Sequence, residues 1–318
     1  MSSTSQPGSL QQLKGRRALV TGGAGFIGSH IAQGLLDHGC SVRVLDDLSG
    51  GLRSNVPAGV EFIQASIMDR SALNAAAQGC HYVFHQAAMV SVPESVQEPL
   101  RCSDVNVLGT QYVLEAARAA KVQRVMFAAS AAAYGNTPTL PCSELHVPDS
   151  YSPYAMSKVA GELLLQTYAR CYAMSTVSLR YFNVYGPRQN PNSPYAAVIS
   201  KFKQLVGEGK NPIIFGDGQQ TRDFVFVGDV VRANLLAATS PRALSGEVIN
   251  IGTGTRITLL QVLQHIARVM GRNVSPEHRE VRAGDIRDSV ADIAKARAVL
   301  AYEPTVEFAQ GIERTLKA

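Results

Sequence analysis

The feature that most constrains the fold is a cluster of three glycines between an apolar run and an amphipathic run. Residues 17–21 are apolar enough, and long enough, for a buried parallel strand. Gly22, Gly25 and Gly28 follow in the spacing GxxGxxG, and an amphipathic helix is predicted through Leu36. Such glycines permit a tight turn, close approach of the backbone to a pyrophosphate, and close packing of helix on strand. The sequence therefore predicts a strand–turn–helix unit that binds the phosphates of a dinucleotide.

Further apolar runs alternate with helical segments along the first two thirds of the chain. Strand and helix in alternation predict an α/β fold with a doubly wound parallel sheet of the Rossmann type, whose ligands bind at the carboxyl ends of the strands. The texture changes at a loop rich in Pro and Asn over 187–194, after which we expect a smaller lobe. Strands are predicted at 17–21, 41–45, 61–64, 82–85, 124–128 and 176–183. The expected organisation is a tail at 1–15, a cofactor domain at 16–180 completed by 222–250, and a smaller α/β lobe from 181–221 and 251–318.

The ends of the second and fourth predicted strands carry the next candidates for the cofactor site. Asp46 lies about 20 residues past the glycines, where a carboxylate accepts hydrogen bonds from the hydroxyls of the adenosine ribose. A carboxylate there repels a 2′-phosphate, so NAD is favoured over NADP. Small residues after the fourth strand let a cofactor lie across its end. The loop after the second strand also supplies Asp47, Ser49 and Gly50, and the loop after the fourth strand supplies Gln86, Ala87 and Ala88.

The candidate catalytic group is Tyr154 with Lys158, together with Ser130 at the end of the fifth predicted strand. Residues four apart on a helix lie on one face, one turn from each other. A neighbouring ammonium favours the phenolate, so we expect a lowered pKa for Tyr154 and a role as a base. Ser130 is placed to donate to the same substrate oxygen and to relay its proton.

Composition excludes several classes of protein. The 318 residues carry a net charge of +5, which suits an anionic ligand. The sequence has no basic block with interleaved aromatic residues, so nucleic-acid binding is not expected. The five cysteines are widely spaced without a CxxC pair, which indicates reduced thiols in a cytoplasmic protein and no metal or disulfide framework. No apolar run is long enough to span a membrane, and residues 1–14 lack the apolar core of a signal peptide. We expect a frayed N-terminal tail; the alternative is an arm that packs on the surface or on a second subunit.

The ordered motifs together resemble the extended short-chain dehydrogenase/reductase family, specifically its UDP-sugar 4-epimerases. The resemblance extends from Arg16 to the C-terminus and includes a nucleotide-sugar signature in its second half. The motifs are TGGAGFIGSH, HQAAMVSVPES, NVLGT, SPYAMSK, RYFNVYGPRQ, FGDGQQTRDFVFVGDV, NIGTG and RAGDIRDSVADI.

The resemblance implies roles for individual residues. The catalytic residues are Ser130, Tyr154 and Lys158. NAD is bound by Gly22, Gly25, Phe26, Ile27 and Asp46, with Ser66, Ile67, Asn106 and, beside the nicotinamide, Phe182. Ser66 departs from the family, which often has an acidic residue there, and this weakens one expected contact on the adenine side. The UDP-sugar is held by Asn183, Ala197, Val198, Lys201, Phe215, Arg222, Arg282, Asp285 and Ser289, with Phe215 beside the uracil. The two arginines are suited to clamp a diphosphate, and the alternative is that both are ordinary surface residues.

The implied activity is epimerisation of a UDP-hexose at C4 through transient oxidation by bound NAD. Dehydratases and decarboxylases of the family carry acidic residues just after the catalytic Ser or Thr, where this chain has Ala131 and Ala132. The motifs are also compatible with a plain dehydrogenase, a catalytically dead sensor or a UDP-uronic acid 4-epimerase. Ser289 stands where the family places one wall of the sugar pocket, and its small size predicts acceptance of N-acetylated sugars. A homodimer through a four-helix bundle is also expected from the resemblance.

Overall fold

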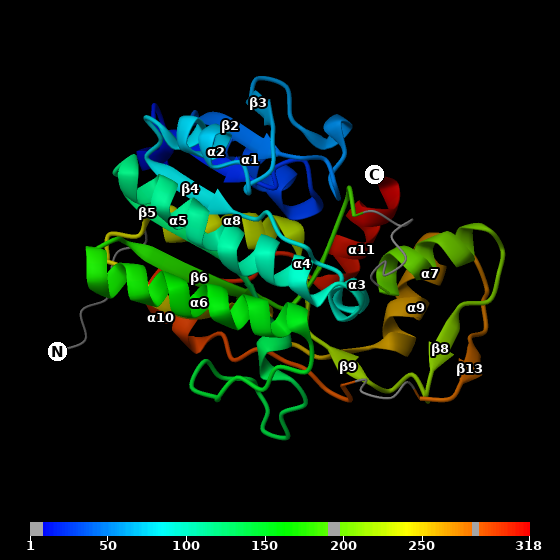
Figure 1. Cartoon of the computed structure of the whole chain (residues 1–318). Helices are drawn as coiled ribbons and strands as arrows, with labels where there is room; N and C mark the ends of the chain where they lie inside the picture. The colour runs from blue at the N-terminus through cyan, green and yellow to red at the C-terminus, as the bar shows by residue number, and fades with distance from the viewer. Residues whose placement is uncertain (1–8, 190–197, 282–285) are drawn as a thin grey trace.

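The sheet at the centre of the molecule has seven parallel strands. The structure, a computed structural model, describes residues 9–189, 198–281 and 286–318. The strand order is β11-β6-β5-β4-β1-β2-β3, and every pairing in it is parallel (Figure 1). The predicted α/β, Rossmann-type fold is confirmed. The strands are β1 (Arg17–Thr21), β2 (Ser41–Asp46), β3 (Glu61–Gln64), β4 (Tyr82–His85), β5 (Arg124–Ser130), β6 (Thr176–Tyr181) and β11 (Ser245–Ile251).

The strand order reverses between β1 and β4. From β1 the chain adds β2 and β3 on one side, then returns to place β4, β5 and β6 on the other. Ligands of such sheets bind in the crevice outside the carboxyl ends of the strands at this reversal. The glycine turn that follows β1 therefore lies where the cofactor is expected.

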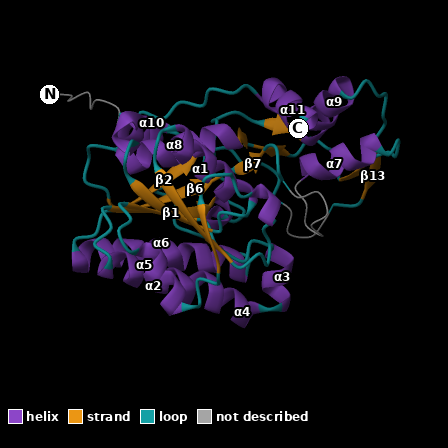
Figure 2. Cartoon of the chain, turned by 90° about the horizontal axis from the view of Figure 1, so that it is seen from above, coloured by secondary structure: helices purple, strands orange, loops and turns teal. Residues whose placement is uncertain are grey.

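Helices cover both faces of the sheet, and each face has its own apolar core (Figure 2). On one face lie α1 (Phe26–Asp37), α8 (Val227–Thr239) and α10 (Ala294–Leu300). The other face carries α2 (Arg70–Ala77), α5 (Gly109–Ala119) and α6 (Pro153–Tyr172). Short helices α3 (Val92–Gln97) and α4 (Pro99–Ser103) and a π-helical segment, Asp104–Leu108, lead into α5. Over the described ranges, no helix combines the length and apolar character needed to cross a bilayer.

The second lobe packs around a third apolar cluster at one end of the sheet (Figure 1). Its helices are α7 (Val198–Gly207), α9 (Leu259–Val269) and α11 (Phe308–Lys317). Short strands pair parallel as β7 (Asn183–Tyr185) with β10 (Phe224–Phe226) and as β8 (Ile213–Phe215) with β13 (Glu277–Arg279). One antiparallel pair joins β9 (Thr221–Arg222) to β12 (Ile257–Thr258).

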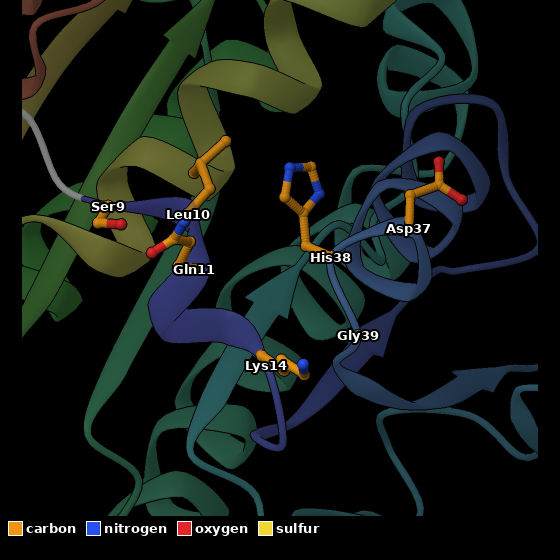
Figure 3. A pocket seen from close by; sticks show the side chains of 7 residues that line it. All are labelled: Ser9, Leu10, Gln11, Lys14, Asp37, His38 and Gly39. Atoms are coloured by element: carbon orange, nitrogen blue, oxygen red, sulfur yellow. The ribbon is translucent and has the colours of Figure 1, made fainter.

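The prediction of a frayed tail over 1–15 is wrong for its described part. Leu10–Leu13 forms a 3₁₀ helix that contacts α8, and Leu13 is fully buried in the core on that face. Residues three apart lie on one side of such a helix, so Leu10 and Leu13 can pack together. Figure 3 shows the outer side of the segment, where Gln11 and Lys14 line a shallow hollow with His38 at the end of α1.

Candidate active site

The glycine turn closes tightly on the end of β4. Gly22 has a positive φ of 70°, and a Cβ there would lie 2.6 Å from the backbone nitrogen of Ala87. A Cβ on Gly28 would overlap the carbonyl oxygen of Gly22. At Gly25, the residue that precedes the first turn of α1, a Cβ would meet only the Gly22 oxygen, at 3.2 Å. The turn thus leaves the N-terminus of α1, with Phe26 and Ile27 in its first turn, open to an anionic group, and it fits the pyrophosphate of NAD.

Asp46 ties the loop after β2 to this turn. Its side chain is buried and accepts hydrogen bonds from the backbone N–H of Ala24 at 2.9 Å and of Leu48 at 2.8 Å. Burial raises the pKa of Asp46, and these two bonds oppose the shift. Next to it, Asp47 accepts from the backbone N–H of Ser49 at 3.0 Å, with Gly50 following on the exposed side. The carboxylate of Asp46 therefore lies beside the glycine turn, and its bond to the ribose stays a prediction.

Further cofactor candidates follow the ends of strands β3, β4 and β6. Ser66 accepts from the backbone N–H of Met68 at 3.2 Å, and Ile67 is buried beneath the loop. Gln86 reaches the hydroxyl of Tyr181, and Ala87 and Ala88 continue from β4. Phe182 follows the end of β6 and is buried.

Asn106 is buried, and its side chain makes hydrogen bonds within the protein. Its side chain accepts from the backbone N–H of Met89 at 2.8 Å and donates to the Met89 carbonyl at 3.0 Å. It also donates to the Ser157 hydroxyl at 2.9 Å. Asn106 thus fastens the loop after β4 to the helix that carries Tyr154.

The start of α6 is fixed by two serine caps. Ser152 accepts from the backbone N–H of Ala155 at 3.1 Å, with Pro153 at the first helical position. Ser95, fully buried in α3, accepts from the backbone N–H of Tyr154 itself at 3.1 Å. The backbone of the candidate base is therefore held from outside its own helix.

The structure brings Ser130, Tyr154 and Lys158 together at the carboxyl end of β5. The Ser130 side chain lies beside the Tyr154 hydroxyl, close enough to favour its ionised form. The ammonium of Lys158 lies 5.8 Å from the centre of the Tyr154 ring and donates to the carbonyl of Ala128 at 2.9 Å. These three residues have the arrangement required to take and relay a proton from a hydroxyl.

The electrostatics differ from the sequence-based expectation. Burial raises the pKa of Tyr154, and the hydrogen bond with Ser130 only partly offsets it. Burial also lowers the pKa of Lys158 to about 8. The prediction that Lys158 lowers the pKa of Tyr154 is therefore wrong in direction, because loss of hydration dominates at both groups.

Most candidates for the sugar nucleotide lie on the second lobe. Arg222 and Phe215 are partly buried on β9 and β8, and the backbone N–H of Ser289 donates to the Thr221 carbonyl at 3.2 Å. Asn183 begins β7, Val198 begins α7, and Lys201 is exposed on α7. Ala197, Arg282 and Asp285 lie outside the described residues, so a clamp by two arginines stays a prediction.

Asp223 joins this lobe to the sheet. The carboxylate is fully buried and accepts from the backbone N–H groups of Thr253, Gly254 and Ala291 and from the Thr253 hydroxyl. Asp223 directly follows Arg222 in the chain, so its hydrogen bonds also hold the backbone from which the Arg222 side chain extends.

Sequence reasoning missed a buried polar network behind the catalytic residues. Glu162 on α6 pairs with Arg180 on β6, and Tyr134 pairs with Asn250 on β11. The local sequence signal for this network was Glu162, a carboxylate one helical turn beyond Lys158 and on the same face of the helix.

His85 is buried at the carboxyl end of β4 with both ring nitrogens satisfied. The Thr21 hydroxyl lies 2.8 Å from Nδ1 and the Thr110 hydroxyl 2.9 Å from Nε2. Thr110 donates its own hydrogen to the Asn106 carbonyl, so it accepts from Nε2. Burial, and secondarily the charge of Lys158, lowers the pKa of His85 to about 3.

This burial predicts a loss of stability in acid. A histidine that is neutral when folded and titrates at its ordinary pKa when unfolded stabilises the protein fully above about pH 6.5, and loses that contribution as the pH falls toward 3. We expect the free energy of unfolding in urea to fall in this window with a His85 contribution of up to about 1.4 kcal/mol per pH unit. His85→Gln should remove this part of the slope, whereas His278→Gln, at an exposed position, should not. An unchanged slope in His85→Gln would contradict the assignment.

Comparison with known proteins identifies the family of the chain. Residues 18–252 match the profile of the NAD dependent epimerase/dehydratase family. The chain belongs to this family. The resemblance to its UDP-sugar 4-epimerases predicted from the sequence is confirmed, and so are the nature of the protein as an enzyme and NAD as its cofactor.

Individual members are similar over nearly their whole length. A UDP-glucose 4-epimerase of Mycolicibacterium smegmatis is 40% identical, covering 95% of this chain and 97% of the relative. The structure of a UDP-N-acetylglucosamine 4-epimerase of Methanobrevibacter ruminantium, in complex with UDP-N-acetylmuramic acid, superposes with a TM-score of 0.91 at 37% identity, covering 96% and 98% of the two chains. A UDP-glucose 4-epimerase of Thermotoga maritima with bound UDP-glucose gives 0.90 at 38% identity, covering 95% and 97%.

Proposed function

We propose that the chain is a UDP-hexose 4-epimerase that accepts UDP-GlcNAc and UDP-GalNAc and also acts on UDP-Glc and UDP-Gal. The observation that carries the proposal is the placement of Ser130 beside Tyr154, with Lys158 one helical turn away, in a chain similar to UDP-sugar 4-epimerases. The structures of relatives hold an acetamido-sugar nucleotide in one case and UDP-glucose in another.

The residues suggest how the reaction proceeds. NAD, when bound, supplies reversible acceptance of a hydride from the C4 carbon of the sugar. Tyr154 takes the proton of the 4-hydroxyl, and Ser130, whose side chain lies beside the phenol oxygen, relays it. Lys158 holds the base against β5 through its bond to the Ala128 carbonyl. The 4-keto sugar turns about its bond to the diphosphate and receives hydride on the opposite face, so Tyr154 returns its proton to the new hydroxyl.

The turn after Ser130 favours epimerisation over elimination. Ala131 and Ala132 begin the short 3₁₀ helix Ala131–Tyr134, and neither side chain can transfer a proton. A dehydratase or decarboxylase needs a further acid or base beside the keto sugar.

The decisive assay incubates the protein separately with UDP-Gal, UDP-GalNAc and UDP-GalA and resolves the epimers. A single 4-epimer product from the first two, without net NADH, is expected. Water loss, carbon dioxide release or net NADH would contradict the proposal. Turnover of UDP-GalA alone would indicate that the substrate is a UDP-uronic acid and not a UDP-hexose.

Ser289 provides a test of sugar size. Its backbone N–H donates to the carbonyl of Thr221, so Ser289 lies near Arg222, the residue proposed to contact the diphosphate. Ser289→Tyr should lower kcat/KM for UDP-GalNAc on the order of 10- to 100-fold relative to UDP-Gal, because a bulky ring excludes the acetamido group. Ser71→Tyr, on exposed α2, is the matched control. Equal losses with both substrates would contradict the assignment of Ser289 to the pocket wall.

The expected homodimer and a cytoplasmic location also belong to the proposal. The helices expected to form the bundle are the one around Val105 to Ala119 and α6, which carries Tyr154. Leu108 on the first and Met156 and Leu163 on the second are exposed, so apolar side chains are available on both. All five cysteines are free, which suits a reducing compartment. Sedimentation analysis of the purified chain tests the dimer.

A further inference from the structure

The network behind the catalytic residues begins with a buried ion pair. Arg180 donates through Nε and Nη2 to the two carboxylate oxygens of Glu162, each at 2.7 Å, and both residues are only 3% exposed. Glu162 lies four residues beyond Lys158 on α6, and therefore on the same face of the helix. The bidentate geometry fixes α6 to β6 in both translation and rotation.

Arg180 connects this helix to the turn that carries Ser130. Its guanidinium carbon lies 4.7 Å from the centre of the Tyr134 ring. Tyr134 ends the 3₁₀ helix that Ser130 caps, and Ser130 accepts from the backbone N–H of Ala132 at 3.1 Å. Tyr134 and the Ser130 hydroxyl therefore belong to the same short turn, at its last residue and at its cap.

Tyr134 is in turn anchored to β11. Its hydroxyl donates to the side-chain oxygen of Asn250 at 2.6 Å. The Asn250 amide donates to the carbonyls of Cys142 at 2.8 Å and of Asp292 at 3.2 Å, and its backbone N–H donates to Glu144 at 2.8 Å. The Tyr134 ring also lies 6.1 Å from that of Phe182, the residue expected beside the nicotinamide.

We propose that Glu162, Arg180, Tyr134 and Asn250 form a positioning relay that sets the spacing between the Tyr154 helix and the Ser130 turn. The inference rests on the proposed function, since it concerns the same catalytic pair. None of the four is a catalytic residue; each acts through another. Misplacement of reacting groups by about 1 Å can reduce a rate about 100-fold, so a relay of this kind controls turnover without contacting the substrate.

Stability alone does not explain why the ion pair is present. Apolar residues of similar volume often replace a buried ion pair without loss of stability. A device that holds a carboxylate, a guanidinium and a phenol in one fixed geometry instead provides directional constraints, which apolar contacts lack. The prediction is therefore that catalysis and stability separate when the relay is changed.

The first experiment uses Tyr134→Phe, which keeps the ring beneath Arg180 and removes the donor to Asn250. With the UDP-hexose that the wild type epimerises, we expect kcat to fall about tenfold with KM unchanged, because the interaction is needed in the transition state and not for binding. NAD content and the melting temperature should stay close to wild type. Tyr168→Phe is the control, since its hydroxyl bonds Glu115 on α5. Wild-type kcat in Tyr134→Phe would overturn the relay.

The second experiment replaces the ion pair with apolar residues in Glu162→Leu/Arg180→Met. We expect a protein that melts near the wild-type temperature yet turns over on the order of 10- to 100-fold more slowly. Wild-type kcat in a folded double variant would overturn the relay, and if this variant fails to fold, Tyr134→Phe alone decides. Tyr154→Phe separates the two proposals: if it is inactive while the relay variants are fully active, only the relay fails. If Tyr154→Phe keeps wild-type turnover, the assignment of the base fails, and if the wild type epimerises no UDP-hexose, the proposed function fails.

Discussion

Tyr154→Phe is expected to lower kcat for the epimerised UDP-hexose by about 10²- to 10⁴-fold, the contribution typical of a positioned acid or base. The phenol oxygen beside Ser130 is the atom removed, while the ring and the buried environment remain. The variant should therefore fold and retain NAD. Initial rates at saturating substrate, with cofactor content measured after denaturation, provide the test.

A matched control makes this result specific to position 154. Tyr172→Phe lies at the far end of the same helix, where the ring is exposed. It should keep wild-type kcat. Turnover in Tyr154→Phe at the level of Tyr172→Phe would show that the proton is taken by another group.

Glu162→Leu is expected to lower the free energy of unfolding by about 3–5 kcal/mol, since it leaves the charge of Arg180 buried without its carboxylate. The loss exceeds that for any exposed ion pair of the protein, which contributes about 0–1 kcal/mol. Urea unfolding at neutral pH measures it. Glu277→Leu, which breaks the exposed pair with Arg279 on β13, is the control and should cost far less.

A thermodynamic cycle isolates the pairing. The double variant Glu162→Leu/Arg180→Met removes both charges together, so it should recover most of the stability that Glu162→Leu loses. If the single and double variants are equally unstable, the packing of α6 on β6, and not the unpaired charge, accounts for the loss.

Local patterns predicted the parts of the site that depend on spacing. The glycine turn, Asp46 and the pair Tyr154 and Lys158 follow from distances along a strand, a turn or a helix. Backbone geometry fixes such distances whatever surrounds them. The alternation of strand and helix predicted the sheet for the same reason, although the fifth strand runs on to Ser130 and the segment after Tyr181 separates as β7.

The sequence by itself thus determined the Rossmann-type fold, NAD as the cofactor and the choice of the candidate base, because these rest on local periodicity and on residue chemistry. Only the tertiary structure decided that Leu13 is core, that Asn106 binds Ser157, and that burial raises the pKa of Tyr154. It alone joined Tyr134 to Asn250, 116 residues apart along the chain. Contacts between distant segments and the loss of hydration that accompanies them arise only when the layers pack, and no spacing along the chain encodes them.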